Sequence, residues 1–299
     1  MIQILLDDFF DEMVSNPMYH LKPVIMKKYV LILIASLPIM SMAQRKPKIK
    51  GNRSVIEVRE ELPPFNAIEL NDNLDIELKK SFGEGYEIIA DDNLIDILKF
   101  QVVDSTLVIS SFYDVTAKKK LEIIVNYKEL KAITQRDGKI ECEDIIKADE
   151  LYINVFGPSK LKLKADAFVA YLNLEDNSNS DFSLDVDSLD IKMKHRSDAK
   201  IYAVTGAKHV ELLNNAALSI DGSTDTLQLK AINNARFKGE KMQSGGANIV
   251  LEESSVARVF ATRDLELQSR GTSKTYLYGD PRISILEFLD TSQLIKKKN

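Results

Sequence analysis

The sequence predicts an all-β protein, a parallel β-helix (β-solenoid) with about 19–21 residues per repeat. Three observations support this prediction. Apolar and polar residues alternate along most of the chain after Gln44, as they do in strands that bury one face. A short apolar–polar–apolar triplet recurs about every 19 residues in the second half. Polar turns separate the strands, and no long helical pattern interrupts them.

The composition is that of a folded protein and excludes several classes of function. Of the 299 residues, 44% are hydrophobic, which is too large a share for a disordered chain. The net charge of -5 argues against a nucleic-acid partner. A single cysteine excludes a disulfide framework and a Cys-rich zinc or iron–sulfur site. We therefore expect no cofactor and no bound nucleic acid.

The first 43 residues contain the pattern of an export signal. A pair of lysines is followed by an uncharged run over residues 30–42, with small residues near its end. This order matches the three regions of a secretory signal peptide over 26–43, with cleavage between Ala43 and Gln44. Because the run is shorter than the roughly 20 residues that span a bilayer, we expect no stable membrane span after cleavage.

Residues 1–25 do not fit an export signal. They carry four acidic side chains, which is the wrong charge for the start of a signal peptide. We interpret 1–25 as a mis-annotated extension ahead of a translation start at Met26. The alternative is a mobile N-terminal helix over residues 2–14. After the signal, 44–53 is predicted to be a linker.

One β-solenoid domain is expected over 54–295, followed by a solvated basic tail at 296–299. The first half of the domain contains short alternating segments such as Leu74-Asp75-Ile76-Glu77-Leu78. One exception is 92–100, where Asp92 is placed to cap a short helix.

From Leu130 onward the chain repeats. Asn, Ser, Gly and Asp fill the turns between strands because they tolerate left-handed backbone or hydrogen-bond their own turn. One coil cannot bury its apolar side alone, so coils stack and form ladders of like residues. The rival fold is a β-sandwich, which does not usually hold one triplet in register through many repeats. The aligned triplets are Leu151-Tyr152-Ile153, Leu172-Asn173-Leu174, Leu189-Asp190-Ile191, Val210-Glu211-Leu212, Leu227-Gln228-Leu229 and Leu265-Glu266-Leu267.

The sequence predicts no catalytic, cofactor-binding or metal-ligating residue. Cys142 alternates with Ile140, so it is expected to be a buried, inert thiol, and its acidic neighbours would raise its pKa. His195 and His209 lack the spacing of a metal-ligand pair and are expected on the solvated surface. Residues 176–181 resemble a calcium loop weakly, because the sixth position lacks the required Gly.

Two tyrosines are the predicted surface contacts. The chain has no Trp, the aromatic residue that most readily supports a sugar ring. Tyr152 and Tyr276 fall at outward strand positions and could take that role, with ordinary strand packing as the alternative. Basic residues could also line one face, as in solenoid lyases, although interleaved acidic residues favour solvated charge. The basic residues at outward positions are Lys162, Lys192, Lys230 and Arg258.

Six short motifs, in a fixed order along the chain, suggest a relationship. They are Leu62-Pro63-Pro64-Phe65-Asn66-Ala67-Ile68, Leu74-Asp75-Ile76-Glu77-Leu78, Asp91-Asp92-Asn93-Leu94, Ser105-Thr106-Leu107-Val108-Ile109, Gly271-Thr272-Ser273-Lys274 and Tyr278-Gly279-Asp280-Pro281. Their order resembles the auto-transporter adhesin family with a head GIN domain, over nearly all of 54–295. The resemblance implies a β-helical fold and a periplasmic or cell-surface setting in a Gram-negative bacterium. It supplies no catalytic residues.

These expectations favour a secreted, non-enzymatic, adhesin-like or cell-envelope-associated binding module. Its partner would be a surface protein or a glycan, contacted along the outward faces of the solenoid. The alternative is a polysaccharide-active enzyme, a lyase or hydrolase, on the same scaffold. Two carboxylates about 5–10 Å apart in a cleft, or a calcium ion beside a lysine, would favour the enzyme.

The first testable expectation concerns the N-terminus of the exported protein. With a start at Met26 and cleavage after Ala43, the exported chain begins at Gln44. Peptide mass spectrometry of the native protein from periplasmic and extracellular fractions should find this terminus. Peptides from 1–25 would contradict the start at Met26, and an exported chain that retains 26–43 would contradict the cleavage site.

Overall fold

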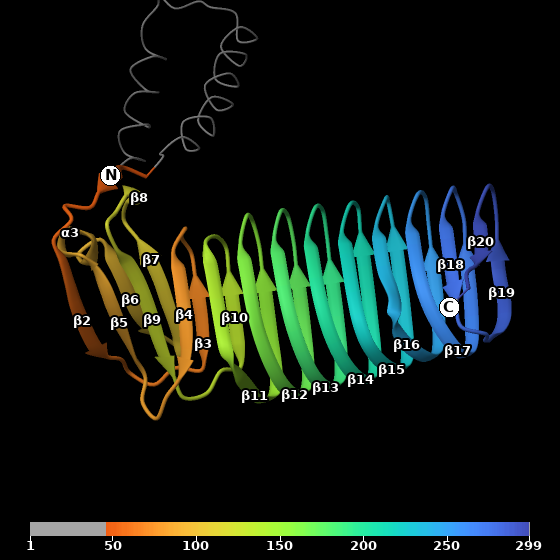
Figure 1. Cartoon of the computed structure of the whole chain (residues 1–299), viewed down its shortest axis with the longest axis horizontal. Helices are drawn as coiled ribbons and strands as arrows, with labels where there is room; N and C mark the ends of the chain where they lie inside the picture. The colour runs from red at the N-terminus through yellow and green to blue at the C-terminus, as the bar shows by residue number, and fades with distance from the viewer. Residues whose placement is uncertain (1–45, 299) are drawn as a thin grey trace, which may run out of the picture. The chain divides into compact units, whose positions relative to one another are not determined.

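The computed structural model describes residues 46–298, which form one elongated stack of parallel coils (Figure 1). Successive coils pair strand to strand in parallel through the whole repeat region. This pairing confirms the predicted β-solenoid over the β-sandwich. The extension at 1–25, the signal peptide at 26–43, and the cleavage site at Ala43 and Gln44 lie outside the described residues.

Each coil of the repeat region consists of one long bent strand and a short turn. Equivalent residues of neighbouring strands face one another across the parallel pairing. Shorter strands complete the stack at its C-terminal end. The strands are β11 (Lys139–Val155), β12 (Lys160–Leu174), β13 (Asn179–Met193), β14 (Asp198–Leu213), β15 (Ala217–Ile232), β16 (Arg236–Leu251), β17 (Val256–Ser269), β18 (Lys274–Tyr278), β19 (Arg282–Phe288) and β20 (Gln293–Lys296).

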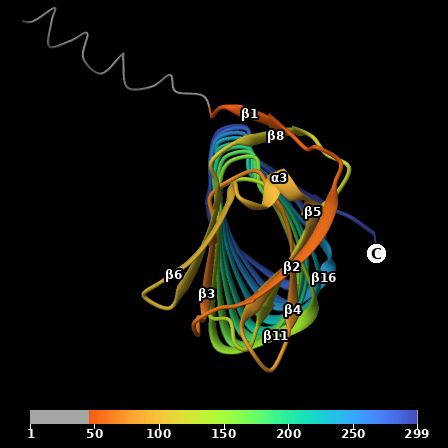
Figure 2. The same ribbon diagram turned by 90° about the vertical axis from the view of Figure 1, so that its left-hand side faces the viewer.

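The bend in each long strand divides the coil into two walls, which are seen edge-on in Figure 2. The first halves of the strands continue from β4 (Asp75–Lys80), and the second halves continue from β3 (Ala67–Leu70) and β10 (Ala132–Gln135). We call the outward surface of the first halves, which includes Lys162, the first face. The outward surface of the second halves, which includes Tyr171, is the second face.

Alternate residues of each strand point inward and form a continuous apolar core. Leu172, Ile191 and Val210 are in register on three neighbouring coils and are almost completely buried. Ladders of this kind bring like side chains together at about 4.8 Å intervals, the spacing of hydrogen-bonded strands. The interior is therefore a packed core rather than a channel.

The repeat is more regular than the triplets in the sequence suggested. Residues in register lie 19 positions apart in every pairing from β12 to β15, and 17 to 21 positions apart where the strands are irregular. The triplets that begin at Leu172 and Val210 are each displaced by two residues from the structural repeat. The displacement arises because the inward position that Leu189 fills is occupied by Ala170 in β12 and by Lys208 in β14.

Each turn places one residue in the left-handed region of the backbone at an equivalent position. Asn, Asp and Gly tolerate this conformation, as the sequence analysis expected. His195 and Glu253 also adopt it, because the neighbouring turns hold them: the carbonyl of Glu253 accepts the backbone N–H of Thr272 at 2.7 Å. Asn234, next to Asn233, is left-handed as well. The left-handed residues at the equivalent position are Gly157, Asp176, His195, Asn214, Asn233, Glu253, Gly271 and Asp290.

The N-terminal end of the stack does not follow the order of the sequence. β3 and β4 form one coil, but the coil beyond them consists of β7 (Thr106–Ser111) and β9 (Leu121–Tyr127), which come later in the chain. β2 (Val55–Glu61) and β5 (Gly85–Asp91) extend this end by antiparallel pairing, and β6 (Leu98–Val103) pairs antiparallel with β7. The alternating segments of this half therefore form two coils that are out of sequence order, and the antiparallel strands beyond them close the solenoid.

The short helix at this end differs from the expected one. α3 covers Asp92–Ile95, and Phe100 lies in β6. The residue before the helix is Asp91, and its side chain caps no helical N–H. Its carboxylate instead accepts the backbone N–H groups of Arg53, Lys119 and Lys120 at 3.2, 3.0 and 3.3 Å.

The hydrogen bonds to Asp91, chiefly the one from the backbone of Lys119, hold the pKa of the carboxyl below its usual value. The carboxylate thereby ties the entering chain to the segment before β9.

Within 44–53, which was predicted as a linker, Lys48–Lys50 forms β1 and pairs in parallel with β8 (Asp114–Ala117). At the C-terminal end, apolar side chains of β19 such as Ile285 and Leu286 are 51% and 59% exposed.

Substitution of two separate glycines tests how closely the backbones of neighbouring coils approach one another. Gly222 has a φ of +114°, and a Cβ there would collide with the carbonyl oxygen of Ala203. Gly222→Ala should lower the free energy of unfolding by at least about 2 kcal/mol. Gly246→Ala is the matched control, because a Cβ there meets nothing within 4 Å. Denaturant titration measures both, and equal stability of the two variants would contradict the expected close approach.

Candidate functional site

The two tyrosines predicted as surface contacts lie on different walls of the solenoid. Tyr152 is on the second face, 42% exposed, and its ring stacks on that of Tyr171 with centroids 4.9 Å apart and planes 11° apart. Tyr276 is half-buried on the first wall, in register with Arg258. Cations of Arg258 and Lys297 lie 5.9 and 5.1 Å from its ring centre. The two tyrosines therefore do not form one site.

Tyr152 and Tyr171 begin a row of outward side chains that follows the second face from coil to coil. Because neighbouring strands lie about 4.8 Å apart, the row extends about 29 Å along the stack. It is made by the in-register pairing and is not visible as a motif in the sequence. We call it the tyrosine row, and its members are Tyr152, Tyr171, Asp190, His209, Gln228, Asn248 and Glu266.

The aromatic end of the row is a stacked pair of partly exposed rings, with Tyr152 42% and Tyr171 39% exposed. Stacking covers one face of each ring, and Tyr171 is in register with Asp190 on the next coil. The Tyr152 hydroxyl donates a hydrogen bond to Glu150 at 2.6 Å, which raises the pKa of Tyr152 and keeps its proton in place. The pair is thus an aromatic platform with a fixed orientation.

The polar part of the row has free hydrogen-bonding capacity. Within residues 46–298, the side chains of Asp190, His209 and Gln228 make no hydrogen bond, and all three lie on the outer surface. Further along, the Asn248 amide donates to Glu266 at 3.2 Å. Amides recur over the whole face, at Asn154, Asn173, Gln228, Asn248 and Gln268.

The charges beside the row neutralise one another. Glu211 lies between two lysines, with Lys192 at 3.5 Å and Lys230 at 3.2 Å. Arg282 pairs with Asp264 at 2.7 Å. The second face therefore offers hydrogen-bonding groups without a strong field of either sign.

A shallow groove occupies the end of the row away from the tyrosines. Its volume is about 450 Å³, and its lining includes Thr226 and Gly246 together with the row members Gln228, Asn248 and Glu266. The Asp264–Arg282 ion pair is part of the same lining. The row thus runs from an aromatic platform at one end to a polar groove at the other.

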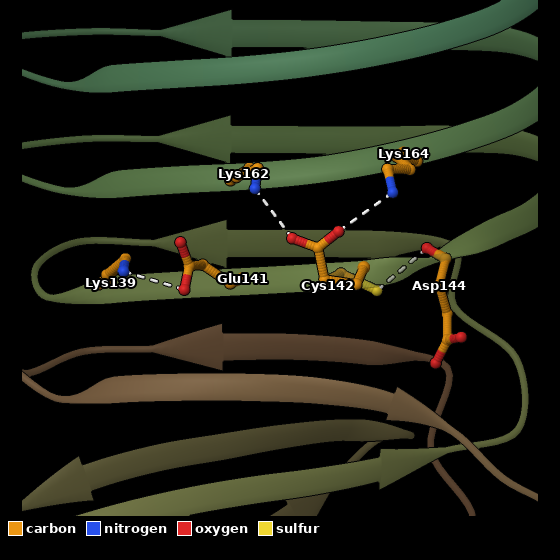
Figure 3. Close-up of polar contacts among 7 residues, drawn as sticks. Lys139, Glu141, Cys142, Asp144, Lys162 and Lys164 are labelled. Carbon is orange, nitrogen blue, oxygen red and sulfur yellow. Dashed lines mark hydrogen bonds and ion pairs between the residues drawn. The ribbon is translucent and has the colours of Figure 1, made fainter.

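The basic residues singled out in the sequence do not line one face. Lys162 and Arg258 lie on the first wall and Lys192 and Lys230 on the second, and each one is paired with a carboxylate. Figure 3 shows the densest cluster, where Glu143 accepts from Lys162 at 2.8 Å and Lys164 at 3.1 Å. These hydrogen bonds lower the pKa of Glu143 to about 2. The cluster is a set of exposed ion pairs, as the solvated-charge interpretation expected.

Cys142 is buried, as the alternation with Ile140 predicted. Its thiol lies 3.4 Å from the Tyr127 hydroxyl and donates to the carbonyl of Asp144 at 3.4 Å, the second of which is drawn in Figure 3. Burial is the main cause that raises the pKa of Cys142, and the charges of Asp144 and Glu143 add to it. The protonated thiol is a poor nucleophile.

The histidines lie where the sequence placed them, on the surface, but in two different settings. His195 is in a turn, with its Nδ1 3.1 Å from the carboxylate of Asp176 on the preceding coil. His209 belongs to the tyrosine row. Within the described residues, no group of three or more His, Cys, Asp or Glu side chains could hold a metal ion.

Lys208 is a buried lysine that was not expected from the sequence. Lys208 is only 2% exposed and donates from Nζ to the carbonyls of Ala203 and Ser223 at 2.9 and 2.8 Å. Burial lowers the pKa of Lys208 to about 8. The strand alternation could have revealed it, because Lys208 stands two residues before the inward-facing Val210.

The geometry of the coils, turns and outward rows can be compared with that of known proteins. Residues 64–281 match the family model described as "Putative auto-transporter adhesin, head GIN domain". The chain belongs to this family. The match confirms the resemblance that the six sequence motifs indicated. Among curated proteins no relative is found.

Several solved structures share the fold of this chain. A "putative adhesin" from Parabacteroides merdae matches with a TM-score of 0.60 and 18% identity, over 84% of this chain and 99% of that one. A "putative adhesin" from Parabacteroides distasonis gives 0.62 and 14%, over 84% and 100%. A "Putative lipid binding protein" from Parabacteroides distasonis gives 0.54 and 18%, over 84% and 98%. At these identities the likeness establishes the fold.

Membership of the adhesin family indicates an adhesin-like role at the cell surface or outside the cell. The described part of the chain has no helix that is long and apolar enough to cross a bilayer.

The burial of the Lys208 ammonium can be tested through the pH dependence of the protein's stability. Its pKa is about 8 in the native protein and 10.5 when unperturbed, so the buried charge is penalised below pH 8. The penalty fades as the pH rises toward 10.5. Relative to Lys208→Met, the wild type should therefore gain up to about 3 kcal/mol of stability between pH 7 and pH 10.5. Guanidinium titrations at several pH values measure this difference, and a difference that does not change with pH would contradict the buried cation.

Proposed function

We propose that the protein is a secreted, non-enzymatic, adhesin-like binding module that contacts its partner along the second face. The exported chain begins at Gln44 and consists of the solenoid domain at 54–295 and the basic tail at 296–299. It acts in the periplasm or on the cell surface of a Gram-negative bacterium. Membership of the adhesin family and the pattern of an export signal at 26–43 support this proposal.

The tyrosine row is the single observation that carries the proposal. A solenoid holds equivalent residues of successive coils at a constant spacing, so the row is an ordered contact surface that loses little conformational entropy on binding. Tyr and Asn are residue types that supply rigid contact area and adaptable hydrogen bonds in binding surfaces. Of the two tyrosines predicted from the sequence, Tyr152 lies in the row and belongs to the proposed contact.

Adhesion of coated beads tests this function directly. Beads that carry the exported form of the protein should attach to bacterial or host cells at least about tenfold more than albumin-coated beads. Asn173→Arg combined with Gln228→Arg places two bulky charges on the second face and should reduce attachment to the albumin level. Asn179→Arg combined with Ser219→Arg makes the same change on the first face and should leave attachment intact.

Cell counts under flow give the readout, and unfolding midpoints confirm that both double variants are folded. Attachment of the wild type no better than albumin, to every cell type tried, would contradict the adhesin-like function. Equal loss in both double variants would contradict the assignment to the second face.

A further inference from the structure

We propose that the tyrosine row is a binding site for a neutral, hydroxyl-rich glycan chain that lies along the stack of coils. The inference rests on the proposed adhesin-like function and names the chemistry of the partner. It follows from three properties of the second face: an aromatic platform, a series of unpaired planar polar side chains, and cations beside the row that are already paired with carboxylates.

The aromatic platform suits the apolar side of a sugar ring. A sugar presents C–H groups on its ring face and hydroxyls around its edge, and aromatic side chains with a polar handle suit surfaces of this mixed kind. Tyr171 is 39% exposed and in register with Asp190, and the stack with Tyr152 holds its ring in position. A sugar ring packed on Tyr171 would lie in line with the polar members of the row.

The polar members match the hydroxyls of a sugar. A hydroxyl both donates and accepts, and so does the carboxamide of Gln228 or Asn173, whereas a carboxylate only accepts and an ammonium only donates. Asp190, His209 and Gln228 have no side-chain hydrogen bond within residues 46–298, so a ligand meets groups that are already free. Their outward positions on three neighbouring coils would engage successive hydroxyls of one chain.

Charge selects a neutral glycan over an acidic one. The lysines beside the row, Lys192 and Lys230, are already paired with Glu211, and Arg282 is paired with Asp264. A sulfated or uronic acid polymer would meet Asp190 and Glu266 without a free cation beside them. The first face, with its charged Glu143 cluster, has no stacked pair of rings beside a series of amides among the described residues.

The shape of the site suits a linear chain. The row extends about 29 Å in a straight line, set by the strand spacing. The groove of about 450 Å³ at its far end would accommodate the chain beyond Asn248. Each coil contributes one contact of modest strength, so the affinity depends on the length of the glycan that is bound.

The binding test uses soluble hexasaccharides of neutral linear polymers: glucans, mannans, galactans and xylans. Oligogalacturonate of the same length is the acidic comparison. Calorimetry with the exported protein should show binding to at least one neutral hexasaccharide, weaker binding to its disaccharide, and none to oligogalacturonate. Absence of binding to every neutral hexasaccharide would overturn the proposal.

Variants locate the site. Tyr171→Ala should weaken the binding at least about tenfold, while Tyr171→Phe, which keeps the ring, should retain most of it. Gln228→Ala should also weaken it. Tyr202→Ala and Asn179→Ala remove an exposed ring and an amide from the first face and should change nothing. Equal binding by wild type and Tyr171→Ala would overturn the assignment to the row, and unfolding midpoints show that each variant is folded.

Cell attachment separates failure of the glycan proposal from failure of the adhesin-like function. Mild periodate oxidation of the cells destroys sugar diols and should abolish bead attachment, whereas protease treatment should not. Attachment that resists periodate but is lost after protease treatment would identify a protein partner, which overturns the glycan proposal and leaves the adhesin-like function standing. Absence of attachment before any treatment would overturn the function itself.

Discussion

In-register parallel pairing between successive coils is the constraint on which the whole structure depends. Each strand donates and accepts backbone hydrogen bonds with equivalent residues of the coils on either side, 17 to 21 positions away in the chain. This pairing makes each position of a strand either inward, in the core, or outward, on the surface. A residue is therefore constrained both by its own strand and by its equivalents in the neighbouring coils.

The same constraint explains the energetics of the interior and the chemistry of the exterior. An inward charge requires hydrogen-bond partners inside the stack, and the Lys208 ammonium has two backbone carbonyls as its partners. Outward positions have no such requirement, so the tyrosine row can hold unpaired polar groups in a fixed line without disturbing the core. Binding capacity on this fold arises from repetition rather than from a pocket with special residues.

The ends of the solenoid require a separate solution, because an open parallel edge exposes unpaired backbone groups. At the N-terminal end, the coil of 106–127 is inserted beyond 67–80, and antiparallel strands and α3 continue past it. The buried carboxylate of Asp91 secures this arrangement by accepting three backbone N–H groups that no strand partner reaches.

The sequence by itself determined the fold class, the inward residues such as Leu151 and Ile153, the burial of Cys142 and the turn chemistry. These features follow from alternation and turn preferences, which act between residues close together in the chain. Tertiary structure alone decided the register between coils, and with it the stacking of Tyr152 on Tyr171, the tyrosine row and the out-of-order coil at the N-terminal end. Neighbouring residues in the stack lie about 19 positions apart and pair through backbone groups that are the same for every side chain. Local pattern therefore cannot choose among registers displaced by two residues, and the packing of the complete core makes that choice.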